Sequence, residues 1–388
     1  MPSAARRRLA LPLALLLAAA LIAAIALARP AAEAEARPKP EFFGVVPTVV
    51  GPGDLTKMAE HGVRTLRHGL FWPAIESTPG TYDWAAYDGL FGAATEAGIR
   101  IFPTLFGTPG WVNFLAGRNQ CGAICAPEGR SARDAFAAFA RAAAERYGPE
   151  GDFWKPSGGG CGLPALCPYE QAPCGCTKPL PVLAWQIWNE QNSSKYYAPK
   201  PNPAAYTEIV STVGAEIKAV DPRADIVLGG MWGPPDADAV TPTIEYLKAL
   251  YAIPNAADTF DSISVHPYAP TLAGVKAQMT RVHKAVRRFG DPNVGTWVTE
   301  LGWASGGPRK EGLVKTPKAQ ARLLTQAFDF LIKKRRAWRL RGVQWYTWRD
   351  AGPGESDCAW CPQAGLLKNG GATKRAGRAF KRIALGIR

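Results

Sequence analysis

Eight short apolar runs, each followed by a stretch with helical periodicity, recur along the chain from residue 43 onward. Consecutive parallel strands need a crossover connection, usually a helix, and eight such units close a sheet on itself. The pattern therefore predicts an α/β fold, a (β/α)8 TIM barrel. The predicted strands are Phe43–Val50, Val63–Phe71, Ile99–Phe106, Val182–Trp188, Ile226–Met231, Ser262–His266, Gly295–Thr299 and Gly342–Trp348. The predicted helices are Asp54–His61, Tyr87–Ala97, Ala132–Arg146, Pro203–Val220, Thr243–Leu250, Val275–Arg288, Pro317–Lys334 and Lys374–Ala384.

The barrel pattern runs without a break in composition to the last residue, so residues 41–388 are predicted to form a single domain. One connection is unusual. Cys121–Pro181 holds one helix and then a Gly-, Pro- and Cys-rich insert before the fourth strand. That stretch is too long for a minimal loop, and we expect a disulfide-stapled flap there.

The first 40 residues have the pattern of a targeting segment followed by a linker. Three arginines, Arg6–Arg8, precede the uncharged apolar run Leu9–Ala28, which is typical of a secretory signal (residues 1–28). The run is also long enough to cross a bilayer as a retained anchor. Small residues at Ala26–Ala28 and Ala32–Ala34 offer cleavage sites, and residues 29–40 resemble a linker. Either reading places the barrel outside the cytoplasm, secreted or anchored by residues 9–28. We expect a monomer that contacts a membrane only if this segment is retained.

Eight cysteines in three loop-like regions agree with export. An even number of cysteines in an oxidising compartment indicates disulfides. A structural zinc site is the alternative, but it usually shows two Cys-x2–4-Cys pairs, which the middle group lacks. A thioredoxin-like redox pair at Cys358 and Cys361 would need a strand–turn–helix context, which does not follow. The cysteines are Cys121, Cys125, Cys161, Cys167, Cys174, Cys176, Cys358 and Cys361.

The chain is basic, with 46 Lys and Arg against 32 Asp and Glu and a formal net charge of +14. The cations concentrate in Lys333–Arg336, Arg339, Arg341 and Lys374–Arg388. A nucleic-acid-binding surface would interleave basic and aromatic residues, and that pattern is absent, so no nucleic-acid partner is predicted. Two interpretations remain open, a solvated helix surface and a loose attraction to anionic polymers of the cell envelope.

Two glutamates follow predicted strands at the end where barrels of this type carry their chemistry. Glu190 follows the fourth strand and Glu300 the seventh, which face each other across an eight-stranded barrel. Cleavage of a glycosidic bond needs one acid for the leaving oxygen and one carboxylate near the anomeric carbon. A structural ion pair explains either glutamate alone about as well. The two together, flanked by Trp and Asn, favour catalysis.

At these residues the chain resembles clan A glycoside hydrolases, retaining barrel enzymes, and is similar to families 5, 39 and 42. The resemblance covers Phe43–Arg349. It rests on an ordered set of motifs, namely Arg67 with Trp72, Asn189–Glu190, His266-x-Tyr268, Thr299-Glu300-x-Gly302-Trp303, and Trp348. One departure is the third strand, which ends Thr104-Leu105-Phe106-Gly107 without the His of many family 5 enzymes.

The resemblance implies a role for each matching residue. Glu190 would be the general acid/base and Glu300 the nucleophile of a double displacement. Asn189 would bind the sugar 2-hydroxyl, Tyr268 and Arg67 would hold Glu300 ionised, and His266 would line the site beside Glu190. Trp348 would form the floor under the sugar. Trp72 and Trp303 belong to a set of aromatics at strand ends that suggests sugar-stacking subsites, with Trp111, Trp188, Trp232 and Trp348.

The predicted substrate is a β-linked oligosaccharide or polysaccharide, and no cofactor or metal is expected. The chain has four His, of which His61 and His283 fall on predicted helices, so no His-rich ligand set is available. A different class of function is a barrel that binds glycans at the cell surface without cleaving them. The presence of both glutamates argues against it, because a binding module needs no acid and nucleophile.

Overall fold

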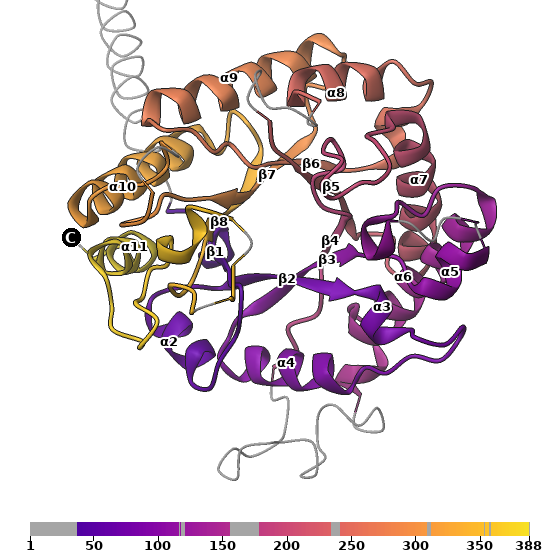
Figure 1. Ribbon diagram of the computed structural model, residues 1–388, viewed down its shortest axis with the longest axis horizontal. Helices are drawn as coiled ribbons and strands as arrows, with labels where there is room; N and C mark the ends of the chain where they lie inside the picture. Colours follow the sequence, from indigo (N-terminus) through magenta and orange to yellow (C-terminus); the bar gives the residue numbers. More distant parts are fainter. Residues whose placement is uncertain are drawn as a thin grey trace, which may run out of the picture. The chain divides into compact units, whose positions relative to one another are not determined.

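The computed structural model describes residues 37–387 except 116, 118–120, 156–177, 234–240, 309–311, 353 and 357. Eight parallel strands follow one another in chain order and β1 pairs with β8, which closes the barrel (Figure 1). The predicted (β/α)8 fold is confirmed. The strands are β1 (Phe43–Val46), β2 (Thr65–Phe71), β3 (Arg100–Phe106), β4 (Ala184–Ile187), β5 (Asp225–Met231), β6 (Ser262–Val265), β7 (Gly295–Leu301) and β8 (Leu340–Tyr346).

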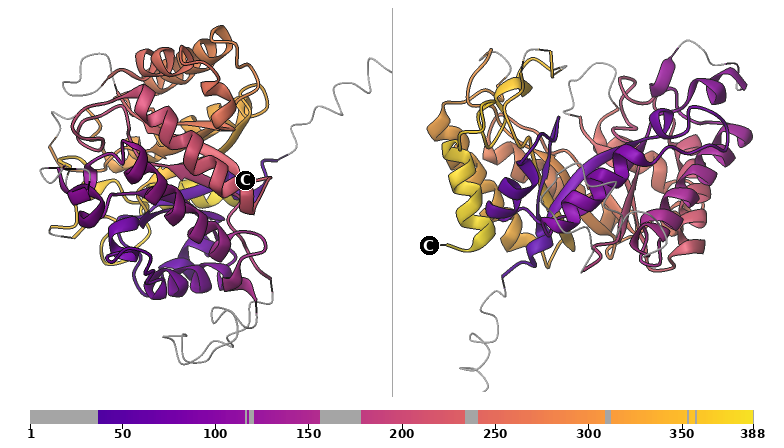
Figure 2. Two further views of the ribbon diagram at one scale, coloured as in Figure 1. Left: turned by 90° about the vertical axis from the view of Figure 1, so that its right-hand side faces the viewer. Right: turned by 90° about the horizontal axis from the view of Figure 1, so that it is seen from below.

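Helices form a ring around the strands, and the eight predicted helices are all present within a few residues (Figures 1 and 2). Among the described residues, two further helices, α3 and α5, are too short to show a periodic pattern. The α-helices are α2 (Asp54–Glu60), α3 (Trp72–Ile75), α4 (Ala85–Glu96), α5 (Gly110–Leu115), α6 (Arg130–Tyr147), α7 (Pro203–Val220), α8 (Thr243–Tyr251), α9 (Leu272–Arg288), α10 (Pro317–Lys334) and α11 (Arg375–Leu385). Short 3-10 turns are η1 (Pro40–Phe42), η2 (Gly122–Ile124), η3 (Asp152–Trp154), η5 (Ala256–Thr259) and η7 (Cys361–Gln363).

The barrel interior is built in layers contributed by alternate strands, as in other barrels of this type. Phe102, Val227 and Trp297, on β3, β5 and β7, form a separate apolar cluster in which the two aromatic rings stack 4.6 Å apart. Polar side chains on the even strands form another layer, in which Gln186 links Arg67 to Ser264. The apolar layer fills the barrel, and the polar layer supports the residues at the strand ends.

Two of the predicted disulfides lie among the described residues and are formed. Cys121 bonds Cys125 in the loop after β3, and Cys358 bonds Cys361 in the loop after β8. Both loops leave the carboxyl ends of strands, so each bridge fixes a loop on the face where chemistry is expected. The other cysteines, Cys161, Cys167, Cys174 and Cys176, lie outside the described residues.

The long connection before β4 is divided by α6 into parts at opposite ends of the barrel. The part with Cys121 follows the carboxyl end of β3. The described flank at Pro181 instead accepts a hydrogen bond from Arg100, the first residue of β3. The staple at Cys121–Cys125 and the approach to β4 therefore do not belong to one flap.

Pro40–Arg388 forms one compact unit. Among the described helices, none is both long and apolar enough to cross a membrane. The predicted signal or anchor (residues 1–28) lies outside the described residues, as does the predicted linker up to residue 36, and both remain predictions.

Candidate active site

Glu190 is carried by an irregular turn that follows β4. The backbone of Trp188 has φ 69° and that of Glu190 has φ 44°, a left-handed conformation that costs a non-glycine residue about 1–2 kcal/mol. The Glu190 N–H donates to the Gly230 carbonyl at 3.1 Å, which ties the turn to the neighbouring strand β5. Such strain is concentrated at functional sites in proteins. The turn directs the Glu190 side chain toward the middle of the barrel mouth.

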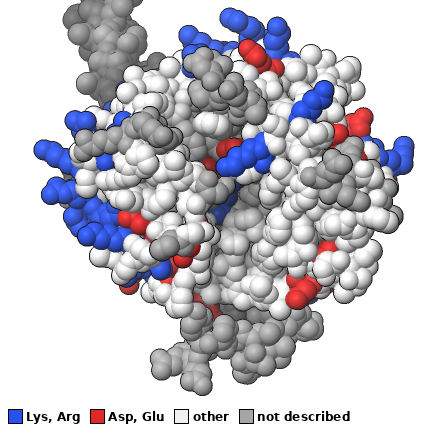
Figure 3. Space-filling model, viewed as in Figure 1, with Lys and Arg blue, Asp and Glu red and all other residues white. Residues whose placement is uncertain are grey.

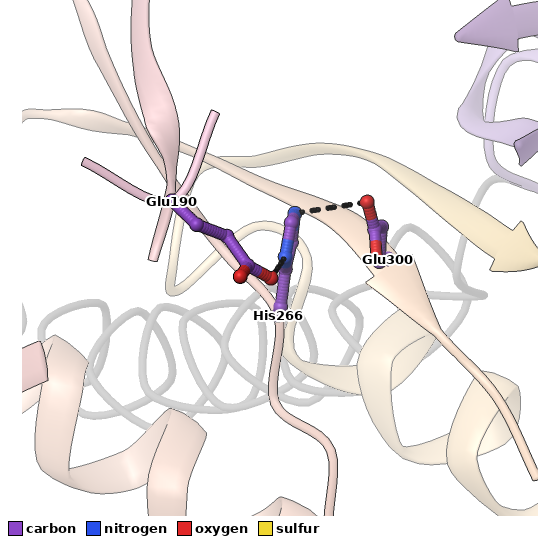
Figure 4. Close-up of side chains that lie close together, drawn as sticks. All are labelled: Glu190, His266 and Glu300. Carbon is purple, nitrogen blue, oxygen red and sulfur yellow. Dashed lines mark hydrogen bonds and ion pairs between the residues drawn. The ribbon is translucent and has the colours of Figure 1, made fainter. Parts of the chain in front are cut away.

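His266, directly after β6, lies between the two predicted catalytic glutamates (Figure 4). Its Nδ1 is 2.8 Å from Glu190 Oε1 and its Nε2 is 3.6 Å from Glu300 Oε1. The ring is buried, with 1% of its surface exposed. A Cβ atom at Gly230 would lie 2.0 Å from His266 Nε2, so a glycine at this point of β5 makes room for the ring.

Glu300 lies near the end of β7 and accepts a hydrogen bond on each carboxylate oxygen. Arg67 Nη1 donates to Oε1 and the Tyr268 hydroxyl donates to Oε2, both at 2.8 Å. A charge-assisted pair and a second donor fix the carboxylate in one orientation. Tyr268 remains a donor because burial, and next the charge of Glu300, raises its pKa well above the ordinary value of 10.0.

Arg67 contacts site residues from both β7 and the region of β4. Besides Glu300, its guanidinium donates to Gln186 Oε1 at 2.7 Å and to Asn189 Oδ1 at 2.6 Å. An arginine keeps its charge at all relevant pH, and its planar donors hold several acceptors in fixed directions. Arg67 thus sets Glu300 and Asn189 relative to each other. Gln186 was not predicted from the sequence, although a polar residue inside an apolar strand was the available signal.

The two carboxylates are close together but lie in different surroundings. One carboxylate oxygen of Glu190 lies within 4.8 Å of one of Glu300. Burial, and to a smaller degree the charge of Glu300, raises the pKa of Glu190, while His266 and Arg67 oppose that rise. Glu190 therefore holds its proton to a higher pH than an ordinary glutamate, and Glu300 faces a cation. A protonated acid next to a carboxylate can donate a proton on one side of a bond and attack on the other.

Glu190, His266 and Glu300 also form a set that can hold a cation, because one ligand atom from each lies within 4.8 Å of the others. The Arg67 guanidinium, 2.8 Å from Glu300, would repel that cation. The charge distribution fits an organic substrate better than a metal ion, and the expectation that no metal is needed remains a prediction.

Three predicted substrate-binding tryptophans do not line the site. Trp72, Trp303 and Trp348 are fully buried, with 0% of their surface exposed, so no ring face is available to a sugar. Trp72 stacks on Phe139 of α6 at 5.7 Å, as a core residue would. Their indole N–H groups donate to Glu76, Ala269 and Asp54, respectively. The predicted sugar floor at Trp348 is wrong, because β8 ends at Tyr346 and the Trp348 ring is buried against His61 and Asp54.

The aromatic rings next to Tyr268, the donor to Glu300, are instead Tyr346 and Trp360, which sequence reasoning missed. Tyr346 ends β8, and its ring lies 6.4 Å from that of Tyr268. Trp360 lies inside the Cys358–Cys361 loop, 5.1 Å from Tyr268 and 5.9 Å from Tyr346. Both are half-buried and keep exposed surface. Tyr346 was missed because the predicted eighth strand ran on to Trp348, and nothing local to Trp360 indicated that its loop folds over the site.

Several solved structures share this architecture. A family 39 glycoside hydrolase from Bacteroides cellulosilyticus superposes with a TM-score of 0.59 and 20% identity, over 90% of this chain and 64% of that chain. A family 39 β-xylosidase from Caulobacter crescentus gives 0.58 and 19%, over 91% and 73%. A family 5 enzyme from Streptomyces cattleya, solved with Manβ1-4GlcNAc, gives 0.60 and 17%, over 89% and 80%.

The fold is that of family 39 and family 5 glycoside hydrolases. The resemblance to clan A enzymes is thereby confirmed at the level of the fold. This chain spans less than two thirds of the length of the Bacteroides protein. No protein-family model matches the sequence, and no curated protein does.

Proposed function

We propose that the chain is a retaining glycoside hydrolase that cleaves β-glycosidic bonds of an oligosaccharide or polysaccharide. Glu190 acts as the general acid/base and Glu300 as the nucleophile. The observation that carries the proposal is the short separation of the two carboxylates, with oxygens within 4.8 Å. Retaining glycosidases place their carboxyl groups about 5–5.5 Å apart, whereas inverting enzymes need room for a water between them.

In the first step, a carboxylate oxygen of Glu300 attacks the anomeric carbon while the bond from that carbon to the leaving oxygen breaks. Glu190 transfers its proton to the leaving oxygen, and a glycosyl ester of Glu300 forms. In the second step, Glu190, now ionised, takes a proton from water as that water attacks the same carbon. The ester bond breaks, Glu300 is released as a carboxylate, and Glu190 regains its proton.

Each neighbouring group has a part in this cycle. The raised pKa of Glu190 keeps a proton available for the leaving group. Arg67 and Tyr268 orient Glu300 for attack through hydrogen bonds of 2.8 Å. The half-buried Asn189, fixed by Arg67, presents an amide toward the site that suits a sugar hydroxyl.

A carbohydrate substrate is supported by the aromatic surface and by the structural neighbours. Tyr346 and Trp360 offer aromatic surface next to Tyr268, the donor to Glu300, and aromatic faces bind the apolar faces of sugars. Figure 3 shows a hollow over the middle of the barrel, where the carboxyl ends of the strands converge. The neighbours include an enzyme described as a β-xylosidase and one solved with a β-linked disaccharide.

The proposal is tested by trapping the glycosyl–enzyme ester with 2-deoxy-2-fluoro aryl β-glycosides, which slow its hydrolysis. We expect mass spectrometry to find the fluorosugar on the peptide that contains Glu300, and Glu300→Gln to remove both labelling and turnover. The rival function is a glycan-binding barrel without catalysis. Binding of oligosaccharides with no turnover of any aryl β-glycoside in a broad panel would support that rival.

We also propose that the enzyme acts outside the cytoplasm. The apolar run at residues 9–28 and the two disulfides support this, because disulfides persist in oxidising compartments. Fractionation of cells and N-terminal sequencing of the exported protein test it. A mature N-terminus between residues 29 and 35 is expected after cleavage, whereas an intact N-terminus in the membrane fraction indicates an anchor.

A further inference from the structure

A groove of about 520 Å³ runs between α10 and α11 on the outside of the barrel. The two helices lie side by side, with Phe328 of α10 packed on Phe380 of α11 at 5.5 Å (Figures 1 and 2). The residues that line the groove do not include any of the active-site residues. Six of them are cations, namely Lys318, Arg322, Arg375, Arg378, Lys381 and Arg382.

The six cations arise from helical spacing. On α10, positions 318 and 322 are one turn apart, and on α11, positions 375, 378 and 382 share one face. The opposite face of α11 is buried through Ala376, Phe380 and Ala384. Packing of the apolar faces therefore brings two basic stripes to the same groove. Five of the six side chains are exposed and Lys381 is half-buried. Figure 3 shows Lys and Arg gathered on this flank of the barrel.

Within the described part of the chain, these cations have no acidic partners. Among the described residues that line the groove, none is acidic, and none of the six cations forms an ion pair within the described part of the chain. Among the described contacts, the Arg378 guanidinium donates only to the Thr373 backbone carbonyl. Like charges at this spacing on a helix repel one another and oppose folding. The groove is therefore a site of unbalanced positive charge.

Another helix pair in the same molecule shows the ordinary arrangement. Between α6 and α7, Arg133 pairs with Glu208, and Arg141 pairs with Glu216 at 2.9 Å. Within α6, Arg141 also pairs with Glu145 at 2.8 Å. Basic residues at that helix–helix surface are thus neutralised within the chain. The contrast indicates that the α10–α11 groove is suited to an anion from outside the chain.

We propose that the α10–α11 groove binds an anionic polysaccharide, one that carries sulfate, phosphate or carboxylate groups along its length. Four of the six cations are arginines, whose planar donors match oxyanions in pairs. A groove between two roughly parallel helices accepts a linear polymer, and the two stripes contact charges along it. This site is separate from the proposed catalytic centre and does not depend on it.

The lining disfavours two other polyanions. Nucleic acids with exposed bases are held by aromatic stacking as well as charge, and no aromatic ring lines the groove. Attachment to an anionic membrane surface usually needs apolar side chains that insert between headgroups. The groove offers one large exposed apolar residue, Ile387. The recess and its charge fit a hydrated polymer better than a bilayer.

The test measures binding of the full chain to dextran sulfate, with neutral dextran, single-stranded DNA and phosphatidylglycerol vesicles as comparisons. We expect dextran sulfate to bind and dextran not to bind. The double variant Arg322→Glu/Arg382→Glu should weaken binding of dextran sulfate at least tenfold. It should also lower the slope of log K against log salt by roughly 2, because two fewer counterions are displaced. A milder pair, Arg322→Gln/Arg382→Gln, gives the same direction if charge reversal impairs folding.

A matched control is Lys333→Glu/Arg336→Glu, which makes the same change in net charge at exposed positions near the end of α10, outside the groove. The control should alter affinity less than threefold, and hydrolysis of aryl glycosides should be unchanged in all variants. Equal weakening by the control would show that net charge rather than the groove causes binding and would overturn the proposal. Absence of dextran sulfate binding, or tighter binding to DNA or vesicles, would also overturn it.

Discussion

At the scale of single residues, the two glutamates are distinguished by their partners. Glu300 accepts hydrogen bonds from a permanent cation and from a tyrosine hydroxyl. Glu190 is buried, has only His266 as its side-chain partner among the described contacts, and its pKa is raised. Two carboxyl groups in such different surroundings are the usual basis for one acting as acid and the other as nucleophile.

The loss of turnover on removal of the Glu190 carboxyl group should depend on the leaving group of the substrate. Glu190→Ala should lower turnover of alkyl glycosides by about 10²–10⁴-fold, the usual contribution of a general acid. Activated aryl glycosides, which need no proton, should still glycosylate Glu300, and added azide should then restore turnover and give a β-glycosyl azide. Product analysis by NMR measures this. An α-configured azide, or a variant as active as the wild type on alkyl glycosides, contradicts the assignment of Glu190.

The pH profile tests the coupling of Glu190 to His266. Glu190 must be protonated for the first step, so kcat/KM falls as pH rises through its pKa. The hydrogen bond from His266 lowers that pKa, so its loss in His266→Phe should raise the pKa and move the alkaline limb to higher pH. Measurement of kcat/KM from about pH 4 to pH 10 locates the alkaline limb of the profile. An unchanged limb, or one at lower pH, would mean that His266 does not act on Glu190.

Sequence analysis placed Glu190 and Glu300 at the barrel mouth, although Glu190 lies on the turn beyond β4, and it misplaced Trp348, which lies beyond β8. Glu190 and Glu300 follow apolar runs directly, and the closure of the barrel brings those ends together. Trp348 was misplaced because the predicted eighth strand extends two residues past the true end at Tyr346. The orientation of a side chain after a strand is decided by how the loop packs, and local sequence does not carry that information.

At the scale of elements, the loop after β8 completes the site. The Cys358–Cys361 bond closes a four-residue loop that presents Trp360 to Tyr268, the donor to Glu300. Sequence analysis predicted the disulfide but not its place over the site. The contact between Trp360 and Tyr268 joins parts of the chain that are far apart in the sequence. No periodic pattern predicts such a contact.

Loss of the Trp360 ring should weaken substrate binding. Trp360→Ala should raise KM for oligosaccharides about tenfold, since a lost aromatic contact costs about 0.5–1.5 kcal/mol beyond the area it buries. Cys358→Ser/Cys361→Ser should change KM in the same direction. Phe114→Ala, at a ring with 71% of its surface exposed on α5, is the control and should leave KM unchanged. Steady-state kinetics measure these changes in KM. An unaltered KM in Trp360→Ala would show that Trp360 does not contact the substrate.

Loss of the Trp72 ring should lower stability and leave substrate binding unchanged, in contrast to loss of the Trp360 ring. Trp72 joins the short helix α3 to α6 in the core and has no exposed surface. Trp72→Ala should therefore lower the free energy of unfolding by about 3–5 kcal/mol, the cost of removing a large buried ring. The remaining folded protein should keep a normal KM. Urea unfolding and active-site titration separate the two effects, and a raised KM with unchanged stability would restore Trp72 as a sugar contact.

At the scale of the whole molecule, the interior of the barrel gives structural support and the carboxyl ends of its strands carry the candidate active site. An apolar cluster of Phe102, Val227 and Trp297 fills the interior, a polar layer with Gln186 holds Arg67, and the carboxylates lie at the strand ends. The strand–helix alternation was sufficient to predict this architecture because each unit repeats one local pattern. The basic groove between α10 and α11 was not predictable as a site, because it depends on which helix faces meet.

The stereochemical outcome of hydrolysis tests the central claim most directly. If the oxygens of Glu190 and Glu300 within 4.8 Å act as proposed, no water fits between Glu300 and the anomeric carbon. The carboxylate then attacks, the centre inverts twice, and a β-glycoside releases a β-configured sugar first. Proton NMR of the anomeric signals in the first minutes of hydrolysis should show the β-anomer before mutarotation mixes the two. An α-anomer as the first product would mean a single displacement by water and would contradict the role of Glu300 as nucleophile.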